Sequence, residues 1–143
     1  MKNILLLGLT IASLISTKIV YAGEGHGHDH NHEAAVEAAP HGGILRDSPP
    51  YKCELVLNND QAKLYIYDKD LKPVTNERLA KTAIGDLGFP KDRTKRQVTF
   101  TLKGDFYEAT LTGISAVHRY DLHISIEVDK KPIIGDFGVD NIH

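Results

Sequence analysis

The stretch Leu122-His123-Ile124-Ser125-Ile126-Glu127-Val128 (LHISIEV) decides the fold class. Apolar and polar residues alternate along it, and a period of two is typical of a β-strand with one buried face. The chain then passes through Asp129-Lys130-Lys131-Pro132, a run of turn-forming residues, into an apolar-rich stretch from Ile133 to Val139. The two stretches predict an antiparallel hairpin near the end of the chain.

The same pattern recurs upstream of this hairpin and predicts two more hairpins and one shorter strand. The seven predicted strands are 51–57, 62–67, 79–84, 97–102, 106–111, 122–128 and 133–139. The sequence shows no helical run of useful length and no internal repeat. It therefore predicts an all-β fold, a single small antiparallel β-sandwich of the Ig-like kind over residues 40–143.

The first 22 residues predict a secretory signal peptide. Lys2 gives a positively charged start, residues 4–15 are mostly apolar, and Ala22 is a small residue at a suitable cleavage point. The apolar run is short for a transmembrane helix, and Lys18 interrupts it. We therefore expect cleavage after Ala22, a periplasmic location and no stable membrane insertion of the mature chain.

Charge and cysteine content limit the function classes further. Lys2 and Lys18 leave with the signal peptide, so the 17 basic residues fall to 15 against 19 acidic residues, a net charge of about −4. This balance disfavours binding to nucleic acid or to an anionic membrane. Cys53 is the only cysteine, so no internal disulfide forms. It falls on the apolar face of its strand, where we expect a buried and inert thiol.

Residues 23–39 (GEGHGHDHNHEAAVEAA) predict a disordered segment, because they offer too little apolar surface to offset the entropy of ordering. This segment carries His26, His28, His30 and His32 at alternate positions. Imidazole suits zinc, copper(II) and nickel ions, and the acidic neighbours favour a cation. The pattern indicates a metal-binding tail, and the alternative is a polar leader without a ligand.

Two further histidines are candidate metal ligands on the domain itself. His41 lies in Pro40-His41-Gly42-Gly43, where the glycines allow close approach of the backbone to a site, or alternatively form a flexible turn. His123 is expected on the solvent face of its strand beside Asp121, as a carboxylate–imidazole pair or as a lone surface histidine. The sequence leaves these alternatives open.

No constellation of catalytic residues is found in the sequence. Serines are few and none lies in a nucleophile elbow, and neither HExxH nor CxxC occurs. We therefore expect a protein that is not an enzyme.

Three short motifs carry a resemblance to a known family. They are Pro40-His41-Gly42-Gly43-x-Leu45, Glu54-Leu55-Val56 at the end of a tyrosine-containing strand, and LYIYDKDLKPV from Leu64 to Val74. They resemble a small periplasmic β-domain associated with membrane fusion (periplasmic adaptor) subunits of heavy-metal efflux systems, over roughly residues 40–128. The resemblance implies metal handling, with His41 and the histidine-rich leader as candidate ligands. The adaptor's hairpin and lipoyl-like regions have no counterpart in these residues.

Together these features predict a periplasmic metal-binding protein for zinc-, copper(II)- or nickel-like cations, acting as a buffer, a carrier or an efflux accessory. Its expected partners are metal ions and an envelope metal-transport component. The alternative is an envelope protein-interaction module without a metal, whose edge strand binds a protein while the tail serves as a polar spacer.

Overall fold

The computed structural model of the chain describes residues 37–141. The predicted signal peptide and the histidines at positions 26, 28, 30 and 32 lie outside the described residues. The disorder predicted for residues 23–39 likewise falls mostly outside the described residues. Within the described range, no helix has the length and apolar character needed to cross a membrane.

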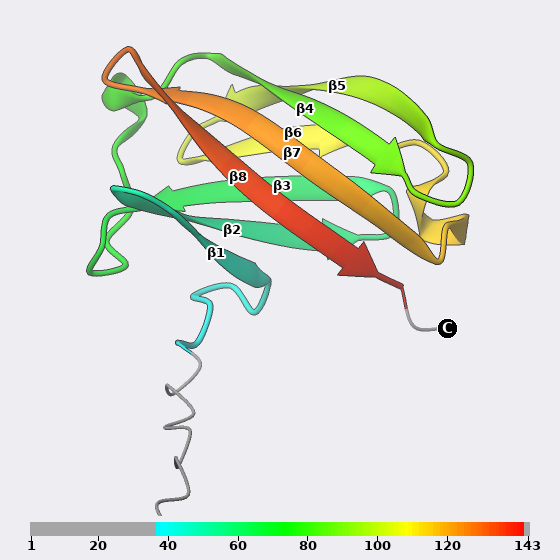
Figure 1. The fold of residues 1–143 in the computed structure, drawn as a ribbon. Coiled ribbons are helices and arrows are strands. Elements are labelled where there is room, and N and C mark those ends of the chain that lie inside the picture. Colours follow the sequence, from blue (N-terminus) through cyan, green and yellow to red (C-terminus); the bar gives the residue numbers. More distant parts are fainter. Residues whose placement is uncertain (1–36, 142–143) are drawn as a thin grey trace, which may run out of the picture. The chain divides into compact units, whose positions relative to one another are not determined.

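The described domain consists of β-strands and two single-turn 3₁₀ helices (Figure 1). The strands are β1 (Ile44–Ser48), β2 (Tyr51–Asn58), β3 (Gln61–Tyr67), β4 (Thr82–Phe89), β5 (Thr94–Lys103), β6 (Phe106–Thr110), β7 (Arg119–Val128) and β8 (Lys131–Asp140). The 3₁₀ helices are η1 (Asn76–Arg78) and η2 (Ile114–Ala116). The strands form one antiparallel sheet in the order β1-β2-β3-β6-β5-β4-β7-β8.

The predicted all-β antiparallel fold is confirmed. The single sheet curls until β1 and β8, its two ends, lie beside each other, so it is nearly a barrel rather than two separate layers (Figure 1). The hydroxyl of Ser48 at the end of β1 donates a hydrogen bond of 2.7 Å to the carbonyl of Ile134 in β8. This contact holds the two ends together and leaves one enclosed core.

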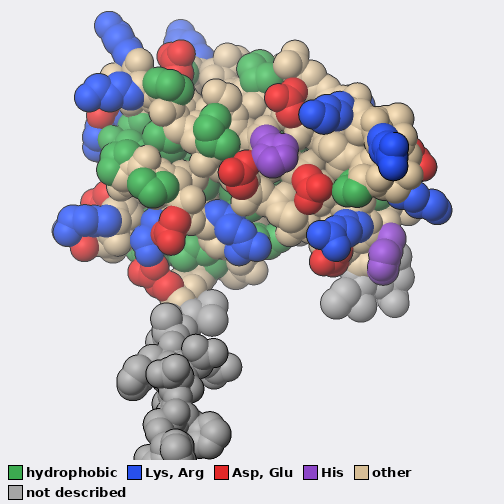
Figure 2. Space-filling view, in the orientation of Figure 1, with side chains coloured by type: hydrophobic (Ala, Val, Ile, Leu, Met, Phe, Trp, Pro, Cys, Tyr) green, Lys and Arg blue, Asp and Glu red, His purple; other side chains and the backbone are tan. Residues whose placement is uncertain are grey.

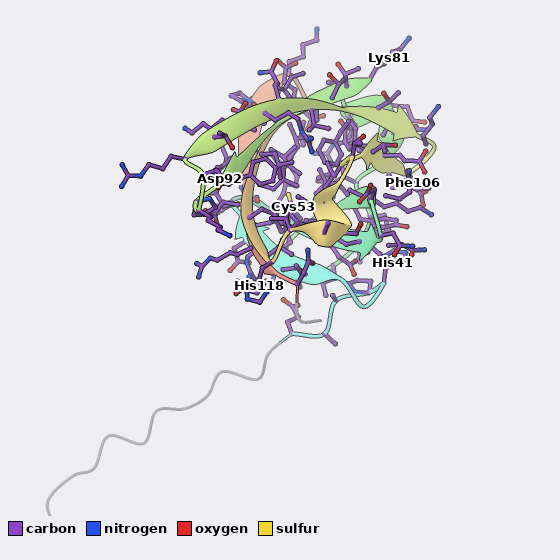
Figure 3. The ribbon with its side chains drawn as sticks, turned by 90° about the vertical axis from the view of Figure 1, so that its right-hand side faces the viewer. His41, Cys53, Lys81, Asp92, Phe106 and His118 are labelled. Atoms are coloured by element: carbon purple, nitrogen blue, oxygen red, sulfur yellow. The ribbon has the colours of Figure 1, made fainter. Side chains whose placement is uncertain are left out.

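The core lies inside the curled sheet and follows the alternation read from the sequence. In β7, Leu122, Ile124 and Ile126 are fully buried, whereas His123 is exposed, as predicted. Cys53 is also buried, as Figure 3 shows, and burial raises the pKa of its thiol to about 11. The largest fully buried side chains are Tyr67, Tyr107, Tyr120, Phe100 and Phe137.

Several strands begin or end a few residues from their predicted bounds, and two differ more clearly from the prediction. The strand expected at residues 79–84 begins later, as β4, and runs on through Gly85 and Gly88. A Cβ at Gly85 would lie 2.9 Å from the ring of Phe100, so this glycine serves close packing inside the sheet and does not end the strand. The prediction lacks strand β1. This strand is only five residues long, its side chains are partly exposed, and two prolines follow it directly, so its sequence gives a weak strand pattern.

Candidate functional site

The turn Pro40-His41-Gly42-Gly43 leads into β1 and lies against β2. Gly42 has a φ of 72°, in the left-handed region that favours glycine. Gly43 has a different role, because a Cβ there would lie 2.5 Å from the carbonyl oxygen of Leu55 on β2. One glycine lets the turn bend and the other lets it approach the strand, and together they fix His41 at the surface.

Glu54 lies beneath this turn and is fully buried. Its Oε1 accepts hydrogen bonds from the backbone amides of His41 (2.9 Å) and Gly43 (2.8 Å), and its Oε2 accepts one from the hydroxyl of Tyr67 (2.7 Å). Burial alone would raise the pKa of Glu54, but the hydrogen bonds from Gly43, Tyr67 and His41 lower it below its ordinary value. Glu54 is therefore an ionised carboxylate that only accepts hydrogen bonds.

The ring of His41 completes this network through Nδ1. This atom lies 2.7 Å from the hydroxyl oxygen of Tyr67 and 3.2 Å from Oε2 of Glu54. Burial, followed by the hydrogen bond to Glu54, raises the pKa of Tyr67, so its hydroxyl keeps the one proton that it donates to the carboxylate. Nδ1 must then carry a proton of its own. In the neutral ring, the lone pair is left on Nε2.

Aromatic packing holds the same ring in place. His41 stacks on Tyr65 with ring centroids 3.8 Å apart and an interplanar angle of 11°. Tyr65 in turn contacts Phe106 at 5.5 Å between centroids, and Figure 3 shows His41 and Phe106 on the same side of the domain. The His41 side chain nevertheless remains 45% exposed. No hydrogen bond to its Nε2 is found within residues 37–141, so the exposed edge of the ring is open to a ligand.

His123 lies on the outer face of β7 and has other partners. Its Nδ1 contacts the carboxylate of Asp136, the residue directly opposite on β8. The pairing suggested by the sequence was with Asp121, two residues along the same strand. The closer carboxylate is the cross-strand neighbour, because residues opposite each other are nearer than alternate residues of one strand. His41 contacts β2 and β3, so the two histidines share no partner.

Within residues 37–141, no three His, Cys, Asp or Glu side chains are grouped as a metal ion would require. Cys53 is a core residue. His26, His28, His30 and His32 lie outside the described residues. Both candidate histidines of the domain have Nδ1 beside a carboxylate, as metal-bound histidines often do, but of the two it is His41 whose ring is also held by a tyrosine hydroxyl and by stacking on Tyr65.

Glu54, Tyr65 and Tyr67 lie in the motifs that carry the resemblance, but sequence reasoning did not identify them as site residues. A signal was available, because the register pairs Glu54 with Tyr65 on the outer face of β2 and β3. Two tyrosines and a carboxylate on a face expected to be solvated indicate that another segment covers it. The segment that covers it, the turn at His41, is not visible from the alternation of β2 itself.

No protein-family model matches this chain, and the comparisons with curated proteins and with solved structures gave no match either.

Proposed function

We propose that this chain is an exported metal-binding protein of the periplasm, with zinc, copper(II) or nickel ions as its cargo. The histidine-rich segment captures the ion, and His41 is the ligand that the folded domain contributes. In this role the protein serves as a buffer, a carrier or an accessory to an envelope metal-transport component.

The observation that carries the proposal is the environment of His41. Histidines that bind metals almost always donate the proton of their other ring nitrogen to a carboxylate, a carbonyl or a water molecule. Nδ1 of His41 faces the Glu54–Tyr67 pair in this manner, and the lone pair lies on Nε2 of a side chain that is 45% exposed. Stacking on Tyr65 further limits rotation of the ring. The imidazole is therefore already oriented before an ion arrives.

The remaining ligands come from His26, His28, His30 and His32. His32 is nine residues before His41, and nine residues span up to about 30 Å when extended. All four histidines can therefore reach Nε2 of His41. Tethering keeps them at an effective concentration on the order of millimolar. Binding by such a segment is labile, because the segment must be ordered each time an ion binds.

The test compares the mature protein with a peptide of residues 23–36 by calorimetric titration with Zn²⁺, Cu²⁺ and Ni²⁺. The protein should bind at least one of these ions about tenfold or more tightly than the peptide, because His41 adds an oriented ligand. His41→Ala should lower the affinity of the protein to that of the peptide.

His118→Ala is the matched control, because His118 is a surface histidine without a side-chain hydrogen bond within residues 37–141. This variant should bind as the parent does. Equal affinity of the protein and the peptide for all three ions would contradict the role of His41. Binding no tighter than that of a generic imidazole-bearing peptide would contradict metal binding altogether.

A further inference from the structure

A hollow of about 410 Å³ lies on the outer side of β4, β5 and β7, and it shares no lining residue with the turn at His41. Its volume is within the range of small-molecule sites in proteins. Phe89 and Pro90, at the end of β4, form an apolar wall. Figure 2 shows the neighbouring face, over β7 and β8, where a histidine is flanked by acidic side chains.

The floor of the hollow is formed by a glycine in the middle of a row of cross-strand neighbours. The register places Gly88 of β4 between Lys95 of β5 and Asp121 of β7. The backbone at Gly88 does not require glycine, since its φ is not positive and a Cβ there would meet only the carbonyl oxygen of Asp121, at 3.8 Å. Because Gly88 has no side chain, it leaves space between Lys95 on one side and Asp121 on the other.

The charges around the hollow are mixed in sign. Asp86 and Asp121 contribute carboxylates, and Arg93 and Lys95 contribute cations. None of these four takes part in an ion pair within residues 37–141, although Arg119, on the same strand as Asp121, pairs with Asp140. The strands of Lys95 and Asp121 are two spacings apart, about 9.6 Å, so the backbones of these two residues are separated by the width of the floor.

We propose that this hollow binds a small zwitterion, a molecule that carries an ammonium group and a carboxylate on a short apolar chain. The ammonium group faces Asp86 and Asp121, the carboxylate faces Lys95 and Arg93, and the chain lies over Gly88 against Phe89. A ligand with a single charge would be attracted by the residues of opposite charge on one side of the hollow and repelled by the residues of like charge on the other side. This site goes beyond the proposed metal binding and does not depend on it.

The test is a titration of the ¹⁵N-labelled protein, in the presence of EDTA, with glycine, 4-aminobutyrate and 6-aminohexanoate. Saturable shifts of the amides of Gly88 and Asp121 are expected, with tighter binding of the longer ligands, because the charges of glycine lie too close together to reach both sides. Butylamine and butyrate, which carry one charge each, should bind more weakly than 4-aminobutyrate. EDTA keeps metal ions out, so the result is independent of the metal proposal.

Gly88→Ala should weaken binding about fivefold, because the methyl group occupies the floor of the hollow. Gly138→Ala is the matched control. Gly138 lies on the other side of Asp121 and does not line the hollow, and a Cβ there would make an ordinary contact of 3.5 Å with the Asp121 carboxylate. This variant should bind as the parent does.

The charge variants Lys95→Gln and Asp121→Asn should each weaken binding about two- to fivefold. Tighter binding by Lys95→Gln together with weaker binding by Asp121→Asn would identify a cation site and overturn the proposal. Weaker binding by Lys95→Gln together with tighter binding by Asp121→Asn would identify an anion site and also overturn it. Absence of saturable shifts up to about 50 mM would also overturn it, since a site with a Kd near 1 mM would be saturated there.

Discussion

Replacing Gly43 by alanine tests the role of the His-Gly-Gly turn, because the structure and a general rule for glycine substitutions predict opposite changes in stability. Gly43 does not have a positive φ, and at such positions Gly→Ala ordinarily stabilises a protein by about 0.4–1 kcal/mol. The structure predicts the opposite sign. The new Cβ would lie 2.5 Å from the carbonyl oxygen and 2.9 Å from the carbonyl carbon of Leu55, and neither backbone atom can move alone. The turn must therefore move away from β2.

The expected cost follows from the hydrogen bonds that this movement breaks. Glu54 would lose the amide donors of His41 and Gly43, which now lie 2.9 and 2.8 Å away. Hydrogen bonds to a charged group contribute about 1.5–3 kcal/mol each, and water restores part of this when the turn opens. We expect the free energy of unfolding to fall by about 2–4 kcal/mol. For a domain of this size, the melting temperature should then fall by about 8–20 °C.

Thermal and denaturant unfolding of the metal-free protein measure this cost. Gly104→Ala, in the turn between β5 and β6, serves as the control because its φ of 68° and open surroundings resemble those of Gly42. Gly42→Ala and Gly104→Ala should each cost about 1–2 kcal/mol, the penalty of the left-handed conformation. If Gly43→Ala costs no more than these two, or stabilises the protein, the close approach to β2 is not what fixes the turn.

Three other predictions concern the tail, the thiol and the buried carboxylate. Deleting residues 23–36 should remove most of the metal capacity measured by titration and leave the melting temperature of the metal-free protein nearly unchanged; a large drop would mean that the tail packs on the domain. Because the pKa of Cys53 is about 11 and its side chain is buried, labelling by a thiol reagent at pH 8 should be slow without denaturant, and rapid labelling would contradict the register of β2. The pKa of Glu54 is lowered from an ordinary value of 4.5, so its contribution to stability is fully present above that pH and is lost as the pH falls through the lower folded-state pKa. The difference in unfolding free energy between the parent and Glu54→Gln should therefore narrow below pH 4.5, and a difference independent of pH from 3 to 7 would show that Glu54 is not ionised in the fold.

The sequence predicts the fold well where one face of a strand is buried. The alternation in residues 122–128 and 133–139 places Leu122 and Ile124 inside and His123 outside, and the structure has the same arrangement. Closure of the sheet is not visible from such patterns. It depends on the pairing of β3 with β6 and on the contact between β1 and β8, which join segments far apart in the chain. Alternation specifies which residues are buried but not which strands are neighbours.

The candidate site was predicted only in part, for a related reason. The histidine and glycines at positions 41–43 stand out in the sequence, but the residue that explains them, Glu54, reads as an ordinary solvent-facing position of β2. Its burial results from the turn folding back over the strand, a contact between residues 11 to 13 positions apart. The partnership of His123 with Asp136 likewise depends on the register between two strands, which the alternation within one strand does not determine.

Under the proposed function, the domain supplies one ligand, His41, and the histidine-rich tail supplies the others, and this division affects how tightly an ion is held. A site made only of tail residues must order the whole segment for each ion, which costs conformational entropy and weakens binding. His41 is held by Glu54, Tyr67 and Tyr65 before any ion arrives, so its contribution carries little of that cost. One fixed ligand strengthens capture, whereas a complete set of fixed ligands would also slow release. Because the fixed part supplies one imidazole and the rest comes from a segment that can exchange ligands stepwise, this arrangement favours capture and transfer of an ion over long-term storage.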